Sequence, residues 1–515
     1  MHLTRLAQQH PDKPAVVTAA TGETVTYRQL DEASVRLSRL LADRGLGFSD
    51  HVALLFENTA AYLTAAWGCQ RSGLYWTPVN HHLTAEEAAY IVRDCGARAL
   101  IVSAGLADLA REVVALVPDL EVRFAAGGTV PGFEELEPAC ADFPAEPPEG
   151  EREGYYMFYS SGTTGRPKGI MPELIGEAFG GGLRIDHTLP LMFGFGPDSV
   201  YLCPAPLYHA APTGWTLGTI RNGGTVVLMD RFDPEQTLQT IEQYQVTHAQ
   251  FVPTMLIRML KLPPEVRKRY DTGSLRAVVH AAAPCPVEVK HQVIDWLGPI
   301  VHEYYSGSEG NCFFLINSEQ WLAHPGSVGR PALGRALVLD DAGTELPIGE
   351  VGTVWFEGGS DFSYHNDPEK TSRAHDGRGR STLGDLGRLD EEGYLYLVDR
   401  RMDLILSGGV NVYPQEIENI LVLHPEVADA AVVGAPDPEM GQRVRAVVQP
   451  ADPAAAGPEL EARLIAHCRE HLARYKCPRT VEFTAEVPRT PTGKLLRRVL
   501  LETSEAAGPG APSFK

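Results

Sequence analysis

The first hundred residues alternate between short apolar runs and amphipathic stretches. The apolar runs are DHVALLFEN at 50–58 and ARALIVS at 97–103, and both are typical of buried strands. The segment TYRQLDEASVRLSRLLADRGL at 26–46 predicts an amphipathic helix with Thr26 as its N-cap. Its apolar face consists of Leu30, Val35, Leu37, Leu40 and Leu41. This alternation of strands and helices predicts α/β layers.

The middle of the chain contains further segments of different character. Residues 119–154 are rich in Pro, Glu and Gly and predict an exposed connector, which leads into a strand at YYMFYS, residues 155–160. A second α/β stretch runs from 199 to 316. Residues 326–399 combine β-branched residues with turn signals such as DDAG and DEEGY, and they predict a small β-rich subdomain.

The pattern starts again after Arg400. A loop, SGGVNVYP, is followed by the helical QEIENILVLH, the strands AAVVGAP and RAVVQP, and a helix around 458–473. The final residues, EAAGPGAPSFK, have the composition of a disordered tail. The expected fold is therefore α/β. We expect a large N-terminal domain at 1–399, with two α/β subdomains and the β-rich one, and a small α+β C-terminal domain at 400–515.

Composition narrows the function classes. The chain has 515 residues, is 44% hydrophobic and carries a formal net charge of −21, which is unsuited to binding nucleic acid. Neither a signal peptide nor an apolar stretch long enough to span a membrane is evident. The eight cysteines are scattered without a C-x-x-C pair, which predicts reduced thiols in a cytoplasmic protein.

The densest chemical signal is SSGTTGRPKG at 160–169, directly after the predicted strand. Its glycines allow close backbone approach, its hydroxyls can donate hydrogen bonds, and Lys168 supplies a positive charge, so the loop suits a polyphosphate. The hydroxyl-bearing and glycine positions expected to contact it are Ser160, Ser161, Gly162, Thr163 and Thr164. The order of residues does not match a Walker A loop, which disfavours a P-loop NTPase.

This loop resembles the signature of the adenylate-forming (ANL) superfamily, which contains AMP-forming acyl-CoA synthetases, peptide-synthetase adenylation domains and firefly luciferases. Further motifs similar to those of the family follow in the family's order, over nearly the whole chain. They are PLYHAAPTGW at 206–215, HAAAPCP at 280–286, YYSGSEG at 304–310, STLGDLGRLDEEGYLYLVDR at 381–400, RRMDLILSGGVNVYPQEIE at 400–418 and PRTPTGKLLRR at 488–498.

The resemblance implies a nucleotide site that binds ATP and Mg²⁺. It implies that Ala282, Ala283 and Pro284 pack against adenine, that Tyr305, next to Tyr304, stacks on it, and that Asp385 and Arg400 contact ribose. Ser308 would lie near phosphate, and Glu309 would coordinate magnesium. Ser306 and Ser308 stand where the family usually has Gly and Thr.

The resemblance also implies the catalytic groups. Lys494 would neutralise charge that develops between carboxylate and α-phosphate, and His209 would help to place the carboxylate. Gly408 and Gly409 would line the channel for coenzyme A. The C-terminal domain would rotate between the two half-reactions. At the usual hinge position, where relatives carry Asp or Lys, this chain has Met402 followed by Asp403.

The function implied is activation of a small-molecule carboxylic acid as acyl-AMP, followed by transfer to coenzyme A, by a monomer or homodimer. The acid pocket is expected near His209, Gln250, His280, Gly307 and Cys312. Three alternatives stay open: a luciferase-like oxygenase, an ATP-dependent diazotase that activates nitrite for an aryl amine, and a nucleotide-binding scaffold without catalysis.

Overall fold

The computed structural model describes residues 1–160, 167–359, 362–400, 403–407, 410–438, 440–490 and 493–506. The chain forms two compact units. The first unit consists of Met1–Phe251, Pro264–Val279 and Asp361–Ser372, and the second of Val252–Pro263, His280–Ser360 and Arg373–Lys515. The predicted division at 400 does not coincide with this partition and stays a prediction.

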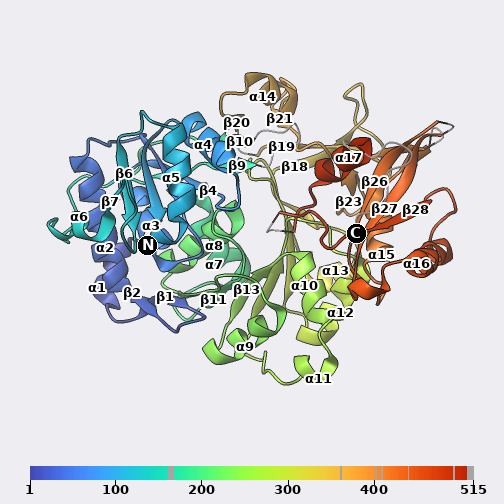
Figure 1. Ribbon diagram of the computed structural model, residues 1–515, viewed down its shortest axis with the longest axis horizontal. Coiled ribbons are helices and arrows are strands. Elements are labelled where there is room, and N and C mark those ends of the chain that lie inside the picture. Colours follow the sequence, from blue (N-terminus) through green and yellow to red (C-terminus); the bar gives the residue numbers. More distant parts are fainter. Residues whose placement is uncertain are drawn as a thin grey trace. The chain divides into compact units, whose positions relative to one another are not determined.

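The first unit contains a wholly parallel six-stranded sheet in the order β7-β6-β5-β3-β4-β8 (Figure 1). Its strands are β7 (Glu134–Glu135), β6 (Val122–Ala126), β5 (Ala97–Ser103), β3 (His51–Leu55), β4 (Tyr75–Val79) and β8 (Tyr155–Tyr156). Leu55, Leu100 and Val102 of this sheet are buried against Val92 and Val113. These last two residues lie on α4 (Ala85–Asp94) and α5 (Ala107–Leu116).

A second sheet in the same unit has β11 (Val200–Cys203) in its middle. Parallel pairing joins β11 to β12 (Thr225–Leu228) and β13 (His248–Phe251), and β12 to β1 (Pro14–Thr18). Strand β2 (Thr24–Thr26) pairs antiparallel with β1. The strand β14 (Ala277–His280) follows β13 in the order of the sheet.

The helices of the first unit connect these strands. They are α1 (Leu3–Gln9), α2 (Tyr27–Asp43), α3 (Ala60–Arg71), the 3₁₀ turn η1 (Ala104–Leu106), α6 (Leu136–Ala141), α7 (Arg184–Phe193), α8 (Ala210–Arg221), α9 (Pro234–Tyr244) and α11 (Pro264–Arg267). A small antiparallel sheet, β20-β10-β9, is formed by β20 (Ser363–Tyr364), β10 (Lys168–Met171) and β9 (Phe158–Ser160). Helix α14 (Pro368–Ala374) follows β20 in the chain.

The second unit begins with α10 (Pro253–Leu260), α12 (Val287–Leu297) and α13 (Ser318–Ala323). Its β15 (Val301–Tyr305), β16 (Phe313–Asn317) and β17 (Arg330–Leu333) pair antiparallel. A five-stranded sheet follows, in the order β18-β19-β22-β23 with β21 beside β19. Its strands are β18 (Arg335–Leu339), β19 (Gly352–Glu357), β22 (Asp385–Leu389), β23 (Leu395–Arg400) and β21 (Arg380–Ser381).

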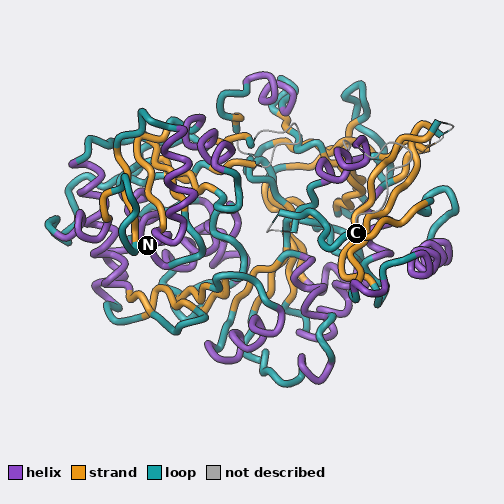
Figure 2. The backbone as a smooth tube through the Cα atoms, viewed as in Figure 1, coloured by secondary structure: helices purple, strands orange, loops and turns teal. Residues whose placement is uncertain are grey.

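The C-terminal part of the second unit has its own sheet and core. The long strands β26 (Val427–Asp437) and β27 (Gly441–Pro450) pair antiparallel, and β28 (Thr480–Phe483) pairs parallel with β27 (Figure 2). The remaining elements are β24 (Ile405–Ser407), β25 (Val410–Val412), α15 (Pro414–Leu421), η3 (Pro453–Ala455), α16 (Pro458–His471) and α17 (Arg497–Ala506). Ile417, Leu421, Val432, Leu460 and Leu464 are fully buried in this core.

The α/β class predicted from the hydrophobic pattern is confirmed, as are the main elements. Thr26 caps α2 by accepting a hydrogen bond from the backbone N–H of Gln29, whose side chain returns to Thr26 in a capping box. The strands at 51–55 and 97–103, the β-rich sheet and the C-terminal helices form where the pattern predicts them. The predicted tail lies mostly outside the described residues, although α17 includes Glu505 and Ala506.

The prediction of an exposed connector at 119–154 is wrong in part. Strand β6 lies within it, and Phe124 and Ala125 are buried because β6 extends the parallel sheet beyond β5. Five residues between Pro-rich and Glu-rich flanks are too few to reveal a periodicity. The short strand therefore escapes a composition argument.

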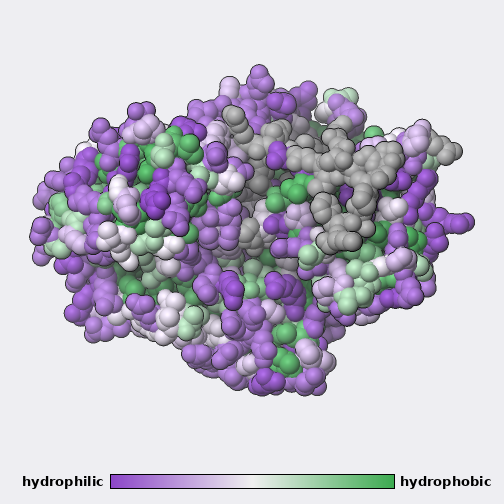
Figure 3. Space-filling model, viewed as in Figure 1, coloured by the Kyte–Doolittle hydropathy of each residue, from purple (hydrophilic) through white to green (hydrophobic). Residues whose placement is uncertain are grey.

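The described surface is mostly polar, with hydrophobic residues dispersed over the visible face (Figure 3). Among the residues that the structure describes, no helix combines the length and the apolar character needed to cross a membrane.

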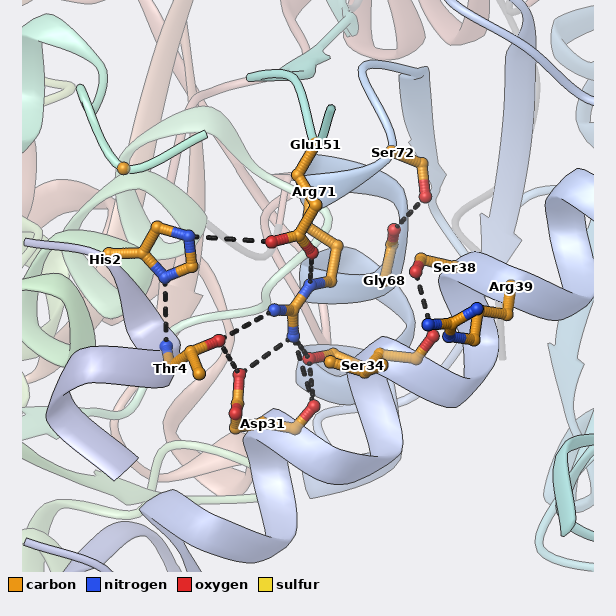
Figure 4. Close-up of polar contacts among 12 residues, drawn as sticks. His2, Thr4, Asp31, Ser34, Ser38, Arg39, Gly68, Arg71, Ser72 and Glu151 are labelled. Carbon is orange, nitrogen blue, oxygen red and sulfur yellow. Dashed lines mark hydrogen bonds and ion pairs between the residues drawn. The ribbon is translucent and has the colours of Figure 1, made fainter. Parts of the chain in front are cut away.

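The first unit contains a buried guanidinium that joins several segments. The side chain of Arg71, at the end of α3, is fully buried and lies at the centre of a polar network (Figure 4). Its Nε donates to Glu151 at 2.5 Å, and its Nη1 donates to Asp31 at 2.9 Å and to the hydroxyl of Ser34 at 2.7 Å. Burial raises the pKa of Glu151, but hydrogen bonds from His2 and Arg71 outweigh it and hold that pKa below its ordinary value.

A second buried arginine, Arg221, lies at the end of α8. It pairs with Glu153 at 2.6 Å and with Asp186 at 3.0 Å. The backbone N–H groups of Gly180 and Gly182 donate to Glu153 at 3.0 and 3.3 Å, which folds the segment GEAFGGGLRID at 176–186 onto this carboxylate. That segment has the composition of a surface loop, yet its backbone binds the buried carboxylate of Glu153.

Phe179 of this segment lies between the two arginines. The centre of its ring is 5.2 Å from the Arg71 guanidinium carbon and 5.3 Å from that of Arg221, and the side chain is buried. An aromatic face stabilises a desolvated cation, so one phenylalanine links both networks.

Replacing Arg71 should destabilise the first unit severely. In Arg71→Met, Glu151 and Asp31 lose their buried partner, and an uncompensated buried charge costs about 3–5 kcal/mol. Urea unfolding would measure the loss. The matched Arg28→Met removes an exposed pair with Asp12 and should cost less than about 1 kcal/mol. Equal effects of the two variants would contradict the importance of the buried network.

Candidate active site

The predicted phosphate loop is flanked by a β-hairpin in the first unit. Strands β9 and β10 pair antiparallel, with Ser160 opposite Lys168, so the loop leaves and re-enters the sheet at neighbouring positions. The side chain of Ser160 and the loop residues Ser161, Gly162, Thr163 and Thr164 lie outside the described residues.

Lys168 is the described cation of this hairpin. Its Nζ donates to the carboxylate of Asp367, which follows β20. The hydrogen bond from Lys168 and the backbone N–H of Lys370 hold the pKa of Asp367 below its usual range. Asp367 thus stays ionised and holds the ammonium group of Lys168 at the start of β10. A phosphate group could compete with Asp367 for this ammonium group.

His209 is held at the N-terminus of α8 by a fixed loop. The side chain of Asn58 accepts from the N–H of Leu207 at 2.8 Å and donates to the carbonyls of Ala205 and Met229 at 3.0 Å each. Asn58 is buried beyond the carboxyl end of β3, where side chains of an α/β sheet often bind ligands or support loops. It was not singled out from the sequence, although its place directly after the predicted strand was a usable signal.

Gln250 is buried on β13, at the carboxyl end of a parallel pair of strands. The hydroxyl of Tyr201, on the neighbouring β11, lies 3.5 Å from its side-chain oxygen.

In the second unit, the structure brings together the residues expected at adenine and ribose. The hydroxyl of Tyr305, at the end of β15, donates to Oδ2 of Asp385, at the start of β22, although 80 positions separate them. Asp385 also lies opposite Arg400 in the pairing of β22 with β23. The backbone of Arg400 is described, and its side chain lies outside the described residues.

The loop between β15 and β16 is closed by a serine. The hydroxyl of Ser306 donates to the carbonyl of Cys312 at 2.7 Å, and the N–H of Gly310 donates to the carbonyl of Gly307 at 3.1 Å. This turn presents Ser308 and Glu309 at its tip. A Cβ added to Gly307 would come within 2.6 Å of a Glu309 carboxylate oxygen, so a side chain at 307 would push that carboxylate away.

Glu309 is the residue of this loop that suits a metal ion. It is half-buried and offers carboxylate oxygens, the ligands that Mg²⁺ prefers. Mg²⁺ commonly uses one or two carboxylates together with substrate phosphates, so a single glutamate is an adequate donor set. The residues present therefore fit a nucleotide-bound Mg²⁺.

Tyr304 and Tyr305 point to opposite faces of their strand, as successive residues of a β-strand do. Tyr304 stacks on Phe313 with ring centres 5.4 Å apart, whereas Tyr305 packs near Phe314 and Phe356. Cys312 is buried with Phe314 and Phe356 in the same hydrophobic cluster. Its predicted place in an acid pocket stays a prediction.

The turn HAAAPCP has a strained residue. Ala282 adopts a φ of 74°, in the left-handed region that disfavours side chains. Ala282 and Pro284 are exposed, and Ala283 is half-buried. The turn therefore presents small side chains, as a surface for a flat base requires, and the surrounding fold bears the backbone strain.

A buried charged pair lies beside this turn in the second unit. Nζ of Lys290 donates to Glu303 at 2.6 Å, and Nε2 of His280 lies 3.7 Å from the same carboxylate. All three side chains are buried. Among the described residues, neither ring nitrogen of His280 has a hydrogen-bond partner. Burial, assisted by the charge of Lys290, lowers the pKa of His280 well below its ordinary value.

Lys494 lies on a tight turn near the C-terminus. Thr490 N–H donates to the Lys494 carbonyl at 2.7 Å, and Lys494 N–H donates to the Thr490 hydroxyl at 3.1 Å. Arg489 holds the base of the turn: it donates to Asp429 through Nε at 2.6 Å and to the carbonyl of Gly493 at 2.8 Å. The half-buried side chain of Lys494 thus extends from a backbone that these hydrogen bonds hold.

The expected hinge is partly described. Met402 lies outside the described residues, but Asp403 pairs with Arg497 at 3.2 Å. Arg497 also donates to both carboxylate oxygens of Glu418. Gly408 and Gly409 lie outside the described residues.

Comparison with known proteins agrees with this arrangement of motifs. The family model described as AMP-binding enzyme matches residues 3–363, and that described as AMP-binding enzyme C-terminal domain matches residues 416–494. A feruloyl-CoA synthase from Amycolatopsis sp is 35% identical over 500 residues, which cover 96% of each chain. A fatty acid–[acyl-carrier-protein] ligase from Streptomyces coeruleorubidus is 33% identical over 96% of this chain and 94% of that protein.

A solved structure is similar over its full length. The crystal structure of an anthranilate CoA ligase in complex with anthranoyl-AMP has a TM-score of 0.84 and 26% identity, and the match covers 98% of each chain. The α/β fold and the ordered motifs define an adenylate-forming enzyme. The chain belongs to the AMP-binding enzyme family, within the ANL superfamily.

Protonation of His280 should make stability depend on pH. The pKa of His280 in the folded protein lies below its unfolded value of 6.5. As the pH falls below 6.5, the imidazole therefore takes up a proton in the unfolded chain but stays neutral in the folded one. The free energy of unfolding decreases as a result. The slope for one proton is about 1.4 kcal/mol per pH unit. Urea unfolding between about pH 6 and 5 should therefore show a shallower decline for His280→Gln than for the unmodified protein. Parallel curves would contradict the buried neutral state.

Proposed function

We propose that the protein is an AMP-forming acid–CoA ligase. In the first half-reaction, the carboxylate of the substrate attacks the α-phosphorus of ATP, and pyrophosphate leaves. The mixed anhydride provides AMP as a leaving group that a free carboxylate lacks. In the second half-reaction, the thiol of coenzyme A attacks the acyl carbon, the thioester forms, and AMP leaves.

The observation that carries this proposal is the likeness to a feruloyl-CoA synthase over 96% of each chain. The likeness to an anthranilate CoA ligase, solved with anthranoyl-AMP, supports an acyl-adenylate as the intermediate. Each motif residue of the described chain is chemically suited to its role.

We assign the nucleotide to the motif residues. Asp385, which accepts a hydrogen bond from Tyr305, is suited to accept hydrogen bonds from the ribose hydroxyls. Arg400, opposite Asp385 in the strand pairing, is proposed to contact the ribose as well. The small side chains of Ala282, Ala283 and Pro284 suit one face of adenine. Lys168 and the hydroxyls of 160–164 are proposed for the phosphates. Glu309 would hold the Mg²⁺, which offsets phosphate charge.

Lys494 and His209 are assigned to the acyl transfer. A lysine between the carboxylate and the α-phosphate offsets the charge that develops there. The Arg489–Asp429 pair supports this role, because it fixes the backbone that carries the lysine. His209, fixed by Asn58 through the loop before α8, is proposed to place the carboxylate.

The second half-reaction is assigned to a different arrangement of the chain. Gly408 and Gly409 would line the path of the pantetheine arm, where a side chain would obstruct it. We propose that the segment 400–515 acts as a mobile domain and that 1–399 binds the substrates. The Asp403–Arg497 pair, next to Met402, is then a contact within the moving part.

The acid is proposed to be an aromatic or medium-chain carboxylic acid, bound near His209, Gln250, His280, Gly307 and Cys312. The relatives act on different acids, as the names feruloyl-CoA synthase and anthranilate CoA ligase say. We further propose a cytoplasmic location, and a monomer or homodimer.

Exchange of labelled pyrophosphate into ATP tests the first half-reaction over a panel of phenylpropenoic, aminobenzoic and fatty acids. Exchange that depends on one class of acid, followed by formation of the CoA thioester, is expected. Exchange without thioester would contradict coenzyme A as the acceptor. Turnover of nitrite and an aryl amine with no carboxylic acid would contradict the proposal altogether, as would binding of ATP without any exchange.

Replacing Lys494 should separate the half-reactions. Lys494→Ala should lower acid-dependent pyrophosphate exchange by at least about 100-fold, because the lost charge acts in that transition state. Thiolysis of supplied acyl-AMP by coenzyme A should change little. Equal loss of both activities would contradict the assignment.

Arg489 is a positioning residue for the same step. Arg489→Ala should lower the kcat of exchange by about 10- to 100-fold and leave the KM for ATP nearly unchanged, because a displaced lysine fails in the transition state. Arg489→Lys should recover part of the rate, since it keeps the charge towards Asp429. The matched Arg463→Ala removes an exposed pair with Glu426 and should have no effect. An altered KM with unchanged kcat would contradict a positioning role.

A further inference from the structure

A cluster of metal-binding side chains lies on the last turns of α16. His467, Glu470 and His471 stand at positions i, i+3 and i+4, so they share one face of the helix. One ligand atom from each lies within 4.8 Å of the other two. Their spacing, H-x-x-E-H, is that of a known zinc-binding pattern on helices.

The cluster is exposed because it lies at the C-terminal end of α16. Leu460, Leu464 and Cys468 are fully buried in the C-terminal core and anchor the helix, and Glu470 and His471 follow Cys468, the last buried residue of α16. Glu470 and His471 are exposed, and His467 is half-buried. A cation from solvent can therefore reach the cluster without a change of the fold.

Both imidazoles have one nitrogen occupied by a backbone carbonyl. Nδ1 of His471 lies 2.9 Å from the carbonyl of His467, and Nε2 of His467 lies 3.3 Å from the carbonyl of Ile420. A carbonyl only accepts, so each of these nitrogens must carry the hydrogen. The other nitrogen of each ring then keeps its lone pair, which is the arrangement typical of histidines that bind metal ions.

The third ligand is also accessible. Within the part of the chain that the structure describes, the carboxylate of Glu470 makes neither an ion pair nor a hydrogen bond. Two neutral imidazoles and one carboxylate offer a net charge of −1, and the whole chain carries −21. A ligand set with this negative charge suits a divalent cation.

We propose that His467, Glu470 and His471 form a binding site for a divalent transition-metal ion, with Zn²⁺ as the physiological class of ligand. Imidazole nitrogens select Zn²⁺, Ni²⁺ and Cu²⁺ over Mg²⁺ and Ca²⁺, which prefer all-oxygen sites. Three protein ligands leave one coordination position for water. The site is separate in ligand chemistry from Glu309 and independent of the proposed ligase activity.

Titration calorimetry with ZnCl₂ on the full, untagged and chelator-treated protein tests the site. One equivalent of Zn²⁺ should bind with micromolar affinity, and excess Mg²⁺ should not compete. His471→Ala and His467→Ala should each weaken binding by about tenfold or more, and Glu470→Gln by less. With Cu²⁺ as the probe, electron paramagnetic resonance should show coupling to imidazole nitrogen that His471→Ala reduces.

Two control variants make the result specific. His187→Ala removes an exposed histidine of the first unit, and Arg469→Ala changes an exposed, non-ligating residue on α16 itself. Neither should alter Zn²⁺ affinity. Absence of binding, or binding that His467→Ala and His471→Ala leave intact, would overturn the proposal. An equal loss in His187→Ala would do the same. None of these readouts depends on turnover, so failure here leaves the ligase proposal untouched.

Discussion

Two arginines without access to water, Arg71 and Arg221, impose the strongest constraint on the first unit. A desolvated guanidinium is tolerated only when carboxylates and hydrogen-bond acceptors surround it. The chain supplies them from distant segments: Asp31 and Glu151 for Arg71, and Glu153 and Asp186 for Arg221. Phe179 covers both cations, so the glycine-rich segment at 176–186 must fold inward. Strand β9, which leads to the predicted phosphate loop, begins a few residues after Glu151 and Glu153. Helix α8 begins directly after His209 and ends at Arg221.

The second unit uses individual hydrogen bonds to hold its motif residues. A serine hydroxyl closes the loop that carries Glu309, a tyrosine hydroxyl meets Asp385, and an arginine fixes the turn of Lys494. The serine and the arginine bind backbone carbonyls, and the side chains of Glu309 and Lys494 stay partly exposed. A catalytic group held in this way loses little further conformational entropy when substrate binds, which is the general advantage of a preorganised site.

The sequence predicted much of this arrangement because its signals were local. Periodicity located α2 and its Thr26 cap, and contiguous motifs located Tyr305, Glu309, Asp385 and Lys494. What it missed depends on contacts between distant segments. Strand β6 is too short to show a period and exists because β5 offers an edge. The role of Asn58 follows from a loop about 150 positions later, and Glu153 acquires its importance only from Arg221. The placing of Cys312 in a pocket and the hinge at Met402 stay predictions.

In the activation of the acid, a carboxylate oxygen of the substrate attacks the α-phosphorus of ATP. An acid labelled with heavy oxygen in its carboxylate tests this directly, with the products analysed by mass spectrometry after reaction with ATP and coenzyme A. One labelled oxygen is expected in AMP, because the bridging oxygen of the acyl-adenylate stays with phosphorus when the thiol attacks the acyl carbon. Label in inorganic phosphate, or AMP without label while thioester accumulates, would contradict it.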